Sequence, residues 1–211
     1  MARSRTILPV PLLVSIACIL ALIAWVGPLL GSAPAPDTEM AETTSLLWRI
    51  DTADVRYGAH RCTRWTGTRW DCQLEPWEWV GPYRGKATSP DGVQWKPCIW
   101  THPRSKDGRP QPLTITFDNV PMDAGLSGHL AILDVPQSGD AVEFTVRVDN
   151  QQMARLRVSD RKERRWTPWR VSPKPGVKTA SVRFELTSKK AAWRHVCFTA
   201  FTAGPDQGEE P

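Results

Sequence analysis

From residue 112 onward, apolar and polar residues alternate with a period of two instead of the helical 3.6. The clearest case is residues 142–148, where every second residue is apolar and the residues between them are polar or charged. Similar alternation occurs in residues 113–117, 154–158 and 182–186. A period of two is typical of half-buried β-strands, because successive side chains point to opposite faces of a sheet. No segment after Leu30 carries a sustained helical stripe, so the sequence predicts an all-β domain.

Turn-forming residues separate the expected strands. Asp149-Asn150 follows one strand directly, and Asn tolerates the positive φ that a tight hairpin turn needs. We expect another turn from Gly125 to Gly128, before an apolar run that starts at His129. Short strands between turns rich in Gly, Pro and Asp predict a β-sandwich. Within that class we expect a jelly roll, in which early and late strands pair.

The N-terminal segment is apolar over a length that suffices to span a bilayer. Ile7 to Leu30 contains no charged residue, and about 20 apolar residues cross the hydrocarbon core. Arg3 and Arg5 precede this run and only acids follow it closely, which predicts a cytoplasmic N-terminus. The folded domain is then expected in the periplasm or outside the cell, attached to the membrane through this helix.

Three interpretations of this segment stay open. We favour an uncleaved signal-anchor helix, because the run is longer than the h-region of a secretory signal. A cleaved signal peptide would end at Ala33-Pro34-Ala35, where the following Pro36 is awkward for cleavage. An acylated Cys18 is the third interpretation, although the apolar run continues past it.

Composition divides the chain into four parts. Residues 1–30 are the expected anchor or signal peptide. Residues 31–44 are rich in Pro, Ala and acids, which is typical of a tether. We expect the sandwich domain at 45–203 and a disordered acidic tail at 204–211.

The cysteines of the expected domain are even in number, and disulfides are the default in an oxidising compartment. We prefer pairing of Cys62 with Cys72, which closes a short loop around Gly67, and of Cys98 with Cys197, which joins the start of the strand-rich region to its last strand. Four cysteines allow three connectivities. A zinc site is disfavoured because no CxxC pair is present. A nucleophilic Cys98 with His102 as its base is disfavoured by the same expected disulfides.

The strand sequences resemble a known family. The segments that carry the resemblance are GLSGHLAILD at 125–134, VEFTVRVDN at 142–150 and VCFTAF at 196–201. They are similar to galactose-binding-like jelly rolls, in particular the discoidin and NPCBM-type carbohydrate-binding modules, where a G-x-x-G…D strand precedes V-x-F-x-V-x-V-D-G. Asn150 replaces the last Gly of that pattern. Over roughly residues 112–202 the resemblance implies the fold and sugar binding through loops at one end, but it assigns no ligand residue.

Tryptophan is unusually frequent, with 11 Trp against 2 Tyr and 5 Phe. Sugar rings stack on exposed indole faces, and an indole also offers an N–H donor. Trp77 and Trp79 lie two apart and would share one face of an extended segment. The alternative is that most indoles fill the core. The tryptophans between residues 48 and 100 are Trp48, Trp65, Trp70, Trp77, Trp79, Trp95 and Trp100.

Positive charge is concentrated late in the chain, where residues 151–200 hold 13 Lys or Arg and only 3 acids. Arg165, Trp166, Trp169 and Arg170 interleave basic and aromatic side chains, which favours an anionic polysaccharide, lipid head groups or an acidic partner. The alternative is a solvated basic loop. Nucleic acid is disfavoured as a partner by the export signal.

These patterns predict a membrane-tethered, extracytoplasmic module that binds carbohydrate or another envelope polymer. The alternative is an accessory or structural subunit of a membrane protein complex. We expect no enzyme and no cofactor, since no motif nominates a glycosidase carboxylate pair and no metal motif is present. A structural calcium ion at Asp118, Asp134 or Asp149 is a weaker alternative. The expected ligand contacts are Trp77, Trp79, Trp166, Trp169, Arg165 and Arg170.

Overall fold

The computed structural model describes residues 44–74, 81–88, 95–133, 139–159, 166–172, 175–192 and 194–202. The chain divides into two compact units, Met1–Glu39 and Met40–Pro211, and every described residue belongs to the second. The expected anchor, nearly all of the tether, and the acidic tail therefore lie outside the described residues. Among the residues that are described, no helix has both the length and the apolar character to cross a membrane.

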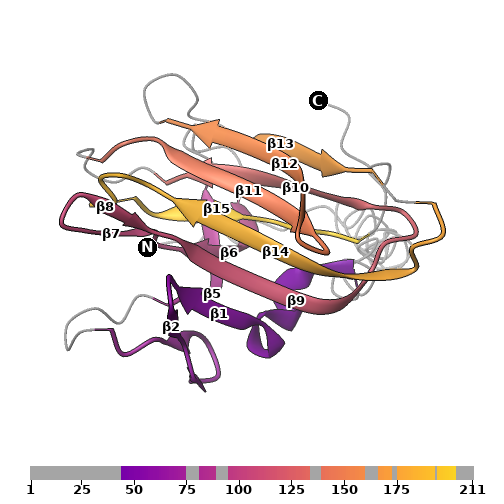
Figure 1. The fold of residues 1–211 in the computed structure, drawn as a ribbon, viewed down its shortest axis with the longest axis horizontal. Helices are drawn as coiled ribbons and strands as arrows, with labels where there is room; N and C mark the ends of the chain where they lie inside the picture. The colour runs from indigo at the N-terminus through magenta and orange to yellow at the C-terminus, as the bar shows by residue number, and fades with distance from the viewer. Residues whose placement is uncertain are drawn as a thin grey trace, which may run out of the picture. The chain divides into compact units, whose positions relative to one another are not determined.

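Two antiparallel sheets make up a β-sandwich (Figure 1), which confirms the all-β prediction. The six-stranded sheet has the order β12 (Gln151–Val158), β11 (Val142–Val148), β14 (Thr179–Thr187), β9 (Leu113–Pro121), β1 (Asp54–Tyr57) and β2 (His60–Arg61). The five-stranded sheet has the order β13 (Thr167–Val171), β10 (Leu126–Ile132), β15 (Val196–Phe198), β6 (Trp95–Thr101) and β5 (Tyr83–Thr88). Two small hairpins pair β3 (Arg64–Trp65) with β4 (Trp70–Asp71), and β7 (Arg104–Lys106) with β8 (Arg109–Gln111).

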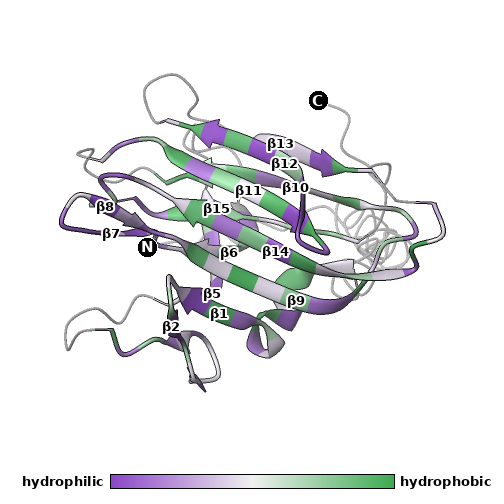
Figure 2. Cartoon of the chain, viewed as in Figure 1, coloured by the Kyte–Doolittle hydropathy of each residue, from purple (hydrophilic) through white to green (hydrophobic). Residues whose placement is uncertain are grey.

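The core lies between the two sheets and is rich in aromatic rings. Phe144 of the six-stranded sheet lies 5.3 Å, centroid to centroid, from Phe198 of the five-stranded sheet. Phe184 and Trp169 make a second contact across the sandwich at 5.8 Å. Figure 2 shows hydrophobic and hydrophilic residues alternating along β9, β11 and β14. The residues that the alternation assigned to the inner face of these strands are buried. The hydrophobic pattern therefore correctly predicted which face of each strand packs on the core.

The two expected turns differ in outcome. Asp149 and Asn150 both have positive φ, 48° and 65°, and connect β11 to β12 as predicted. The turn predicted from Gly125 to Gly128 is shorter, because β10 already begins at Leu126. Gly128 lies within the strand for a packing reason. A Cβ there would be 2.0 Å from the Thr199 carbonyl oxygen and 2.7 Å from the Trp169 ring.

Both expected disulfides are present. Cys62 and Cys72 have their Cα atoms 4.2 Å apart and flank the β3–β4 hairpin. Cys98 and Cys197 have a Cα separation of 5.6 Å and join the neighbouring strands β6 and β15. The second pair belongs to a small apolar cluster with Ala87, Ala131, Leu133 and Trp166, separate from the main core. All four thiols are thus bonded, and neither the zinc site nor the Cys98 nucleophile forms.

The helical element of the domain was not predicted from the sequence, and neither were the strands before residue 112, apart from the hairpin at Gly67, nor β13. Residues Leu46–Thr52 form a 3-10 helix, η2, whose first N–H groups are capped by the Ser45 hydroxyl, which accepts from the Leu47 N–H at 3.3 Å. Leu46, Leu47 and Ile50 of this helix are buried in the main core. A single helical segment of 7 residues is too short to show a sustained stripe.

Candidate ligand-binding site

An exposed indole on η2 marks the candidate site. Trp48 is 42% exposed and is the only large hydrophobic side chain that is exposed among the described residues. Its neighbour Leu47 is buried, and so is Ile50 two residues further on. Because these two side chains fix η2 on the core, they leave the Trp48 indole directed at solvent.

A guanidinium lies between Trp48 and a second indole. The Arg84 carbon Cζ is 5.7 Å from the Trp48 ring centroid and 5.3 Å from that of Trp65, within the range of cation–π attraction. Arg84 also donates to the Trp48 carbonyl oxygen at 2.9 Å and pairs with the Asp51 carboxylate at 3.1 Å. We call Trp48, Trp65, Arg84 and Asp51 the tryptophan platform. Its charges are balanced, since one cation faces one carboxylate.

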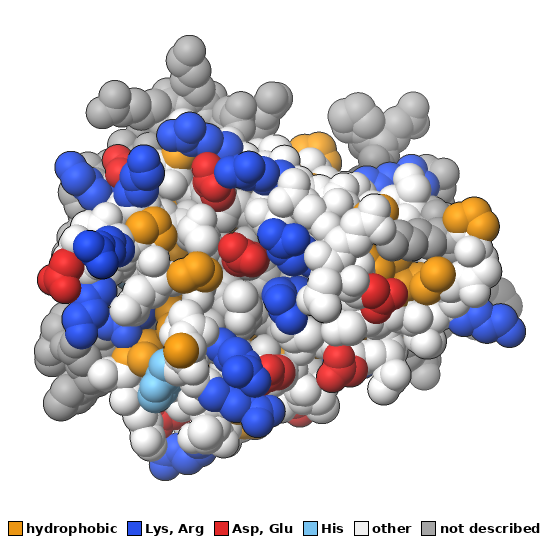
Figure 3. Space-filling view, viewed as in Figure 1, with side chains coloured by type: hydrophobic (Ala, Val, Ile, Leu, Met, Phe, Trp, Pro, Cys, Tyr) orange, Lys and Arg blue, Asp and Glu red, His pale blue; other side chains and the backbone are white. Residues whose placement is uncertain are grey.

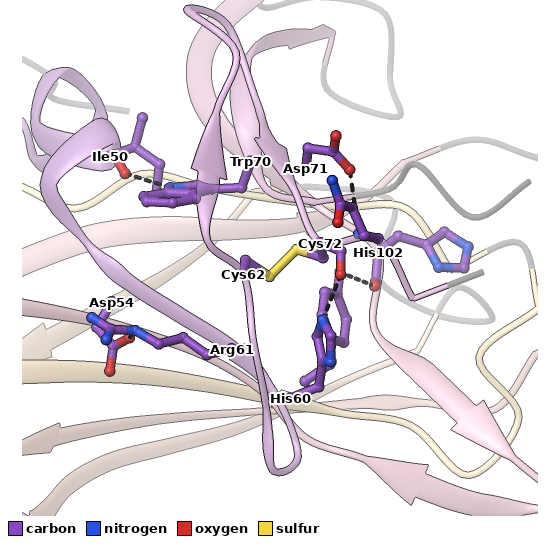
Figure 4. Close-up of a disulfide and its surroundings, with 11 residues drawn as sticks. Ile50, Asp54, His60, Arg61, Cys62, Trp70, Asp71, Cys72 and His102 are labelled. Carbon is purple, nitrogen blue, oxygen red and sulfur yellow. Dashed lines mark hydrogen bonds and ion pairs between the residues drawn. A yellow bond between two sulfur atoms is a disulfide. The ribbon is translucent and has the colours of Figure 1, made fainter. Parts of the chain in front are cut away.

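Trp65 is held by the hairpin on which it lies. It is directly opposite Trp70 in the β3–β4 pair, with ring centroids 5.9 Å apart in an edge contact. Trp70 donates its indole N–H to the carbonyl oxygen of Ile50 at 2.7 Å, which anchors the hairpin on η2 (Figure 4). The turn contains Gly67, with φ of 98°, as the sequence predicted. The hairpin and η2 therefore hold the two indoles of the platform from opposite sides.

The Cys62–Cys72 disulfide closes this hairpin, and polar contacts surround it. Figure 4 shows the disulfide between Trp70 on one side and His60 on the other. His60 Nε2 lies 2.6 Å from the Cys72 carbonyl oxygen. Arg64 pairs with Asp71 across the hairpin and lowers the pKa of that carboxyl, with the Gln73 N–H as a further donor to it. These contacts restrict the hairpin before any ligand arrives, which is the condition for low ordering entropy on binding.

A second aromatic cluster lies over β5, β6 and the residue before β15. Tyr83 stacks on Trp100 at 5.4 Å, and His195 lies 4.9 Å from His102. Burial, followed by the neighbouring His195, lowers the pKa of His102 to about 4, and burial also lowers the pKa of His195. Burial raises the pKa of Tyr83 to about 12. The two imidazoles are therefore neutral at ordinary pH.

Within the described parts of the chain, no group of three or more His, Cys, Asp or Glu side chains is placed to hold a metal. Two of the aspartates considered for calcium can be located. Asp149 accepts from the Ser181 N–H at 3.0 Å, and Asp118 is exposed on β9. Asp134 lies outside the described residues.

The expected ligand contacts fall in different places. Trp77, Trp79 and Arg165 lie outside the described residues, and Arg170 is exposed on β13. Trp166 and Trp169 are only 8% and 5% exposed, so their ring faces are covered by protein. Trp169 packs against Phe144 and Phe184 in the core. For these indoles the core-filling alternative describes the packing, while ligand contact stays a prediction.

The sequence singled out Trp48 and Trp65 only as members of a group, and it missed Arg84 and Asp51. Arg84 meets the Trp48 carbonyl across 36 positions of the chain. No spacing signal exists for such a contact, because it depends on where β5 and η2 meet in the fold.

Comparison with solved structures finds carbohydrate-binding modules, the class named by the resemblance in sequence. One is the CBM51 of GH95 from Clostridium perfringens in complex with methyl-galactose, with 12% identity, a TM-score of 0.38, and coverage of 57% of this chain and 81% of that chain. Another is the tandem CBM51 modules of Sp3GH98, the family 98 glycoside hydrolase from Streptococcus pneumoniae SP3-BS71, with 14% identity and a TM-score of 0.40. That alignment covers 72% of this chain and 47% of the other. No protein-family model and no curated protein matches the chain.

Proposed function

We propose that this domain is a non-catalytic module that binds carbohydrate, with the tryptophan platform as its binding site. The observation that carries the proposal is the exposed Trp48 indole, held in place by Arg84. An indole face of this kind stacks on the C–H face of a sugar ring. The Arg84 and Asp51 side chains, 29% and 39% exposed beside it, supply a donor and an acceptor for sugar hydroxyls.

The charge balance of the platform indicates which sugars it takes. Asp51 neutralises Arg84 at 3.1 Å, and no cation of the platform is left for an acidic group. A neutral sugar with adjacent hydroxyls matches this arrangement, because a carboxylate accepts from one hydroxyl while a guanidinium donates to the next.

The strand order supports the finer proposal that the sandwich is a jelly roll. The eight strands from β6 to β15, with the β7–β8 hairpin left out, divide into β9-β14-β11-β12 and β6-β15-β10-β13. The first of them, β6, pairs with the last, β15, and the second, β9, pairs with the seventh, β14. This nested pairing of early with late strands is the connectivity of two Greek keys wound into a jelly roll.

The location of the domain is also a proposal. We place it outside the cytoplasm and tether it to the membrane through Ile7 to Leu30. Its two disulfides favour an oxidising compartment. In sealed inverted membrane vesicles, added protease is expected to cleave the N-terminus and to leave the domain protected. In intact spheroplasts the expected result is the reverse.

The binding site is tested with Trp48→Ala in the full chain, titrated calorimetrically with methyl-galactose, lactose and dextran. We expect the affinity for whichever of these sugars the parent chain binds to fall at least about tenfold. The variant lacks the indole that stacks on the sugar ring and shields that contact from water. Trp169→Phe is the matched control, since it also deletes an indole but one that is buried in the core. Equal affinity of Trp48→Ala and the parent chain would rule out the platform.

A further inference from the structure

The outer face of the six-stranded sheet is polar and rich in arginine. Figure 3 shows this face, on which basic side chains are gathered with acids between them. Every strand contributes outward-facing polar residues at positions paired across the sheet. They are Arg155 and Arg157 on β12; Glu143, Thr145 and Arg147 on β11; Arg183, Glu185 and Thr187 on β14; Thr114 and Thr116 on β9; Asp54 and Arg56 on β1; and Arg61 on β2.

Several of these arginines are paired with acids within the sheet. Arg155 pairs with Glu143 at 2.7 Å. Arg56 and Arg61 share the Asp54 carboxylate at 2.9 and 2.7 Å. These contacts pair three of the arginines near the lateral edges of the sheet, whereas Arg157, exposed on the edge strand β12, makes no ion pair with a described residue.

Arg56 and Arg61 are directly opposite each other in the β1–β2 pair, with Asp54 in contact with both. The centre of the face holds a second opposed pair of arginines, and this pair shares no carboxylate. Arg147 of β11 and Arg183 of β14 are Cα partners in the ladder. Directly opposite side chains have Cβ atoms roughly 4.5 to 5.5 Å apart, and like charges at such positions destabilise a sheet. Arg147 is 3.7 Å from Glu185 and donates to the Asn150 carbonyl at 3.3 Å. Arg183 makes no ion pair with any described residue, although it is only half-buried.

We propose that Arg147 and Arg183, the arginine pair, bind the carboxylate or sulfate group of an acidic polysaccharide that lies across this sheet face. A guanidinium presents paired N–H donors that fit an oxyanion, and an anion between two opposed arginines removes their repulsion. The proposal extends the proposed carbohydrate binding to a second surface. It rests on other residues than the tryptophan platform and is tested separately from it.

The pattern of the face favours a sugar polymer over other anions. Glu143, Glu185 and Asp54 lie among the arginines, so a polymer with closely spaced charge, such as DNA, would meet repulsion as well as attraction. An acidic polysaccharide carries its charges farther apart and has hydroxyls between them. Thr116 is the cross-strand neighbour of Arg183 and is partly exposed, whereas Thr145, two positions before Arg147, is only 8% exposed. The Thr116 hydroxyl can donate to and accept from those of a sugar.

Hydrophobic partners fit this face poorly. Among the described residues the one exposed large hydrophobic side chain is Trp48, which belongs to η2 and not to the sheet. Membrane-surface helices and the centres of protein interfaces depend on apolar side chains. The outer face presents charged groups and threonines in their place.

The test compares two double variants of the full chain that remove the same formal charge from the same sheet. One is Arg147→Gln with Arg183→Gln, and the matched control is Arg56→Gln with Arg61→Gln. Each is examined by affinity electrophoresis in polygalacturonate, in dextran sulfate and in neutral dextran. We expect the first variant to bind at least one acidic polymer about tenfold more weakly than the parent chain, as for loss of hydrogen bonds to a charged group. The control should change by less than about twofold, since its arginines are already paired.

Each result decides the proposal. Loss in polygalacturonate, in dextran sulfate or in both identifies the oxyanion as carboxylate, sulfate or either. Equal losses of affinity in the two double variants would show that only net charge matters and would overturn the site. The site would also be overturned if the parent chain bound neither acidic polymer. Stronger dependence of duplex DNA or anionic vesicle binding on the arginine pair would overturn the choice of occupant. Trp48→Ala distinguishes the two surfaces, because it is expected to weaken the binding of neutral sugars and to leave binding at the arginine pair unchanged.

Discussion

Trp100 donates its indole N–H to Nδ1 of His195 at 3.2 Å, and this bond connects β6 to the residue that leads into β15. Because Nδ1 accepts, the neutral form of His195 carries its proton on Nε2. Protonation of Nδ1 would set two donors against each other. His102 lies 4.9 Å from the same ring, so charging both imidazoles would add repulsion at one point of the fold. Two further neighbours supply no negative charge that would stabilise a protonated imidazole. Tyr57 donates its hydroxyl to the His102 carbonyl oxygen, and the Arg104 guanidinium lies over the Tyr57 ring.

The domain should therefore lose stability in mild acid. An unfolded His takes up its proton near pH 6.5, whereas His102 in the fold does so with a pKa of about 4. Between these pH values the unfolded chain binds more protons than the fold, so the unfolding free energy falls as the pH falls through this window, and this contribution levels off below it. Urea unfolding at several pH values from 7.5 to 3.5 measures the slope.

His102→Gln should flatten that slope, because the neutral amide does not titrate. His60→Gln is the control, since His60 is exposed and lies apart from the pair, beside the Cys72 carbonyl. A slope that is unchanged in His102→Gln would show that other groups control the acid response.

The two disulfides should differ in what their loss does. Cys98 and Cys197 are separated by 99 positions, and in the chain-entropy model such a loop contributes about 4.7 kcal/mol. Cys62 and Cys72 are separated by 10, for which the same relation gives about 2.7 kcal/mol. We expect Cys98→Ala with Cys197→Ala to lower the unfolding free energy more than Cys62→Ala with Cys72→Ala. Urea unfolding of both under oxidising conditions tests the order.

Removal of the Cys62–Cys72 disulfide, which should cost less stability, should have the larger effect on ligand binding. Cys62 and Cys72 flank the hairpin that carries Trp65, whereas Cys98 and Cys197 lie in the apolar cluster with Ala131. Calorimetric titration at a temperature where both variants are folded separates the two effects. If the Cys98–Cys197 variant lost more sugar affinity, the hairpin would not be a support of the platform.

The support of the platform is tested more finely by Trp70→Phe. The Ile50 carbonyl accepts the Trp70 indole N–H at 2.7 Å, and both groups are buried. Loss of this bond should lower the unfolding free energy by about 1 to 3 kcal/mol, because a buried acceptor is left unsatisfied. Affinity for the sugar should fall as well, since Trp65 packs on the edge of Trp70. Trp169→Phe is again the control, because its indole N–H has no hydrogen-bond partner among the residues that the structure describes. A decrease in affinity of equal size in both variants would contradict the anchoring role.

The sequence predicted the sandwich well because its information is local. Val142 to Val148 alternates with a period of two, and the structure buries the apolar set of that strand. The Asp149-Asn150 turn follows from the φ values that these two residues tolerate. Both cysteine pairings were also predicted, since few connectivities were available.

The candidate sites could not be predicted in the same way. Arg84 reaches Trp48 and Trp65 only because β5, η2 and the β3–β4 hairpin meet in space. The arginine pair depends on the register of β11 against β14, which places Arg147 opposite Arg183. The frequency of tryptophan identified the residue type of the platform, but exposure distinguishes Trp48 from the buried Trp169. Exposure and register are properties of the assembled sheets, so they are absent from any single segment.

The arginine pair makes a prediction about stability that is independent of any ligand. Since Arg183 faces the like charge of Arg147 and makes no ion pair with the described residues, Arg183→Gln should leave the unfolding free energy unchanged or raise it by about 0.2 to 1 kcal/mol. Arg155→Gln removes the same charge from the neighbouring strand β12 but breaks the 2.7 Å pair with Glu143, so it should be neutral or slightly destabilising. Thermal unfolding of the two variants at low ionic strength compares them directly, and added salt should reduce the difference because it screens exposed charges. If Arg183→Gln were the more destabilising of the two, Arg183 would stabilise the folded domain itself, which would contradict its role as an arginine available to an anion.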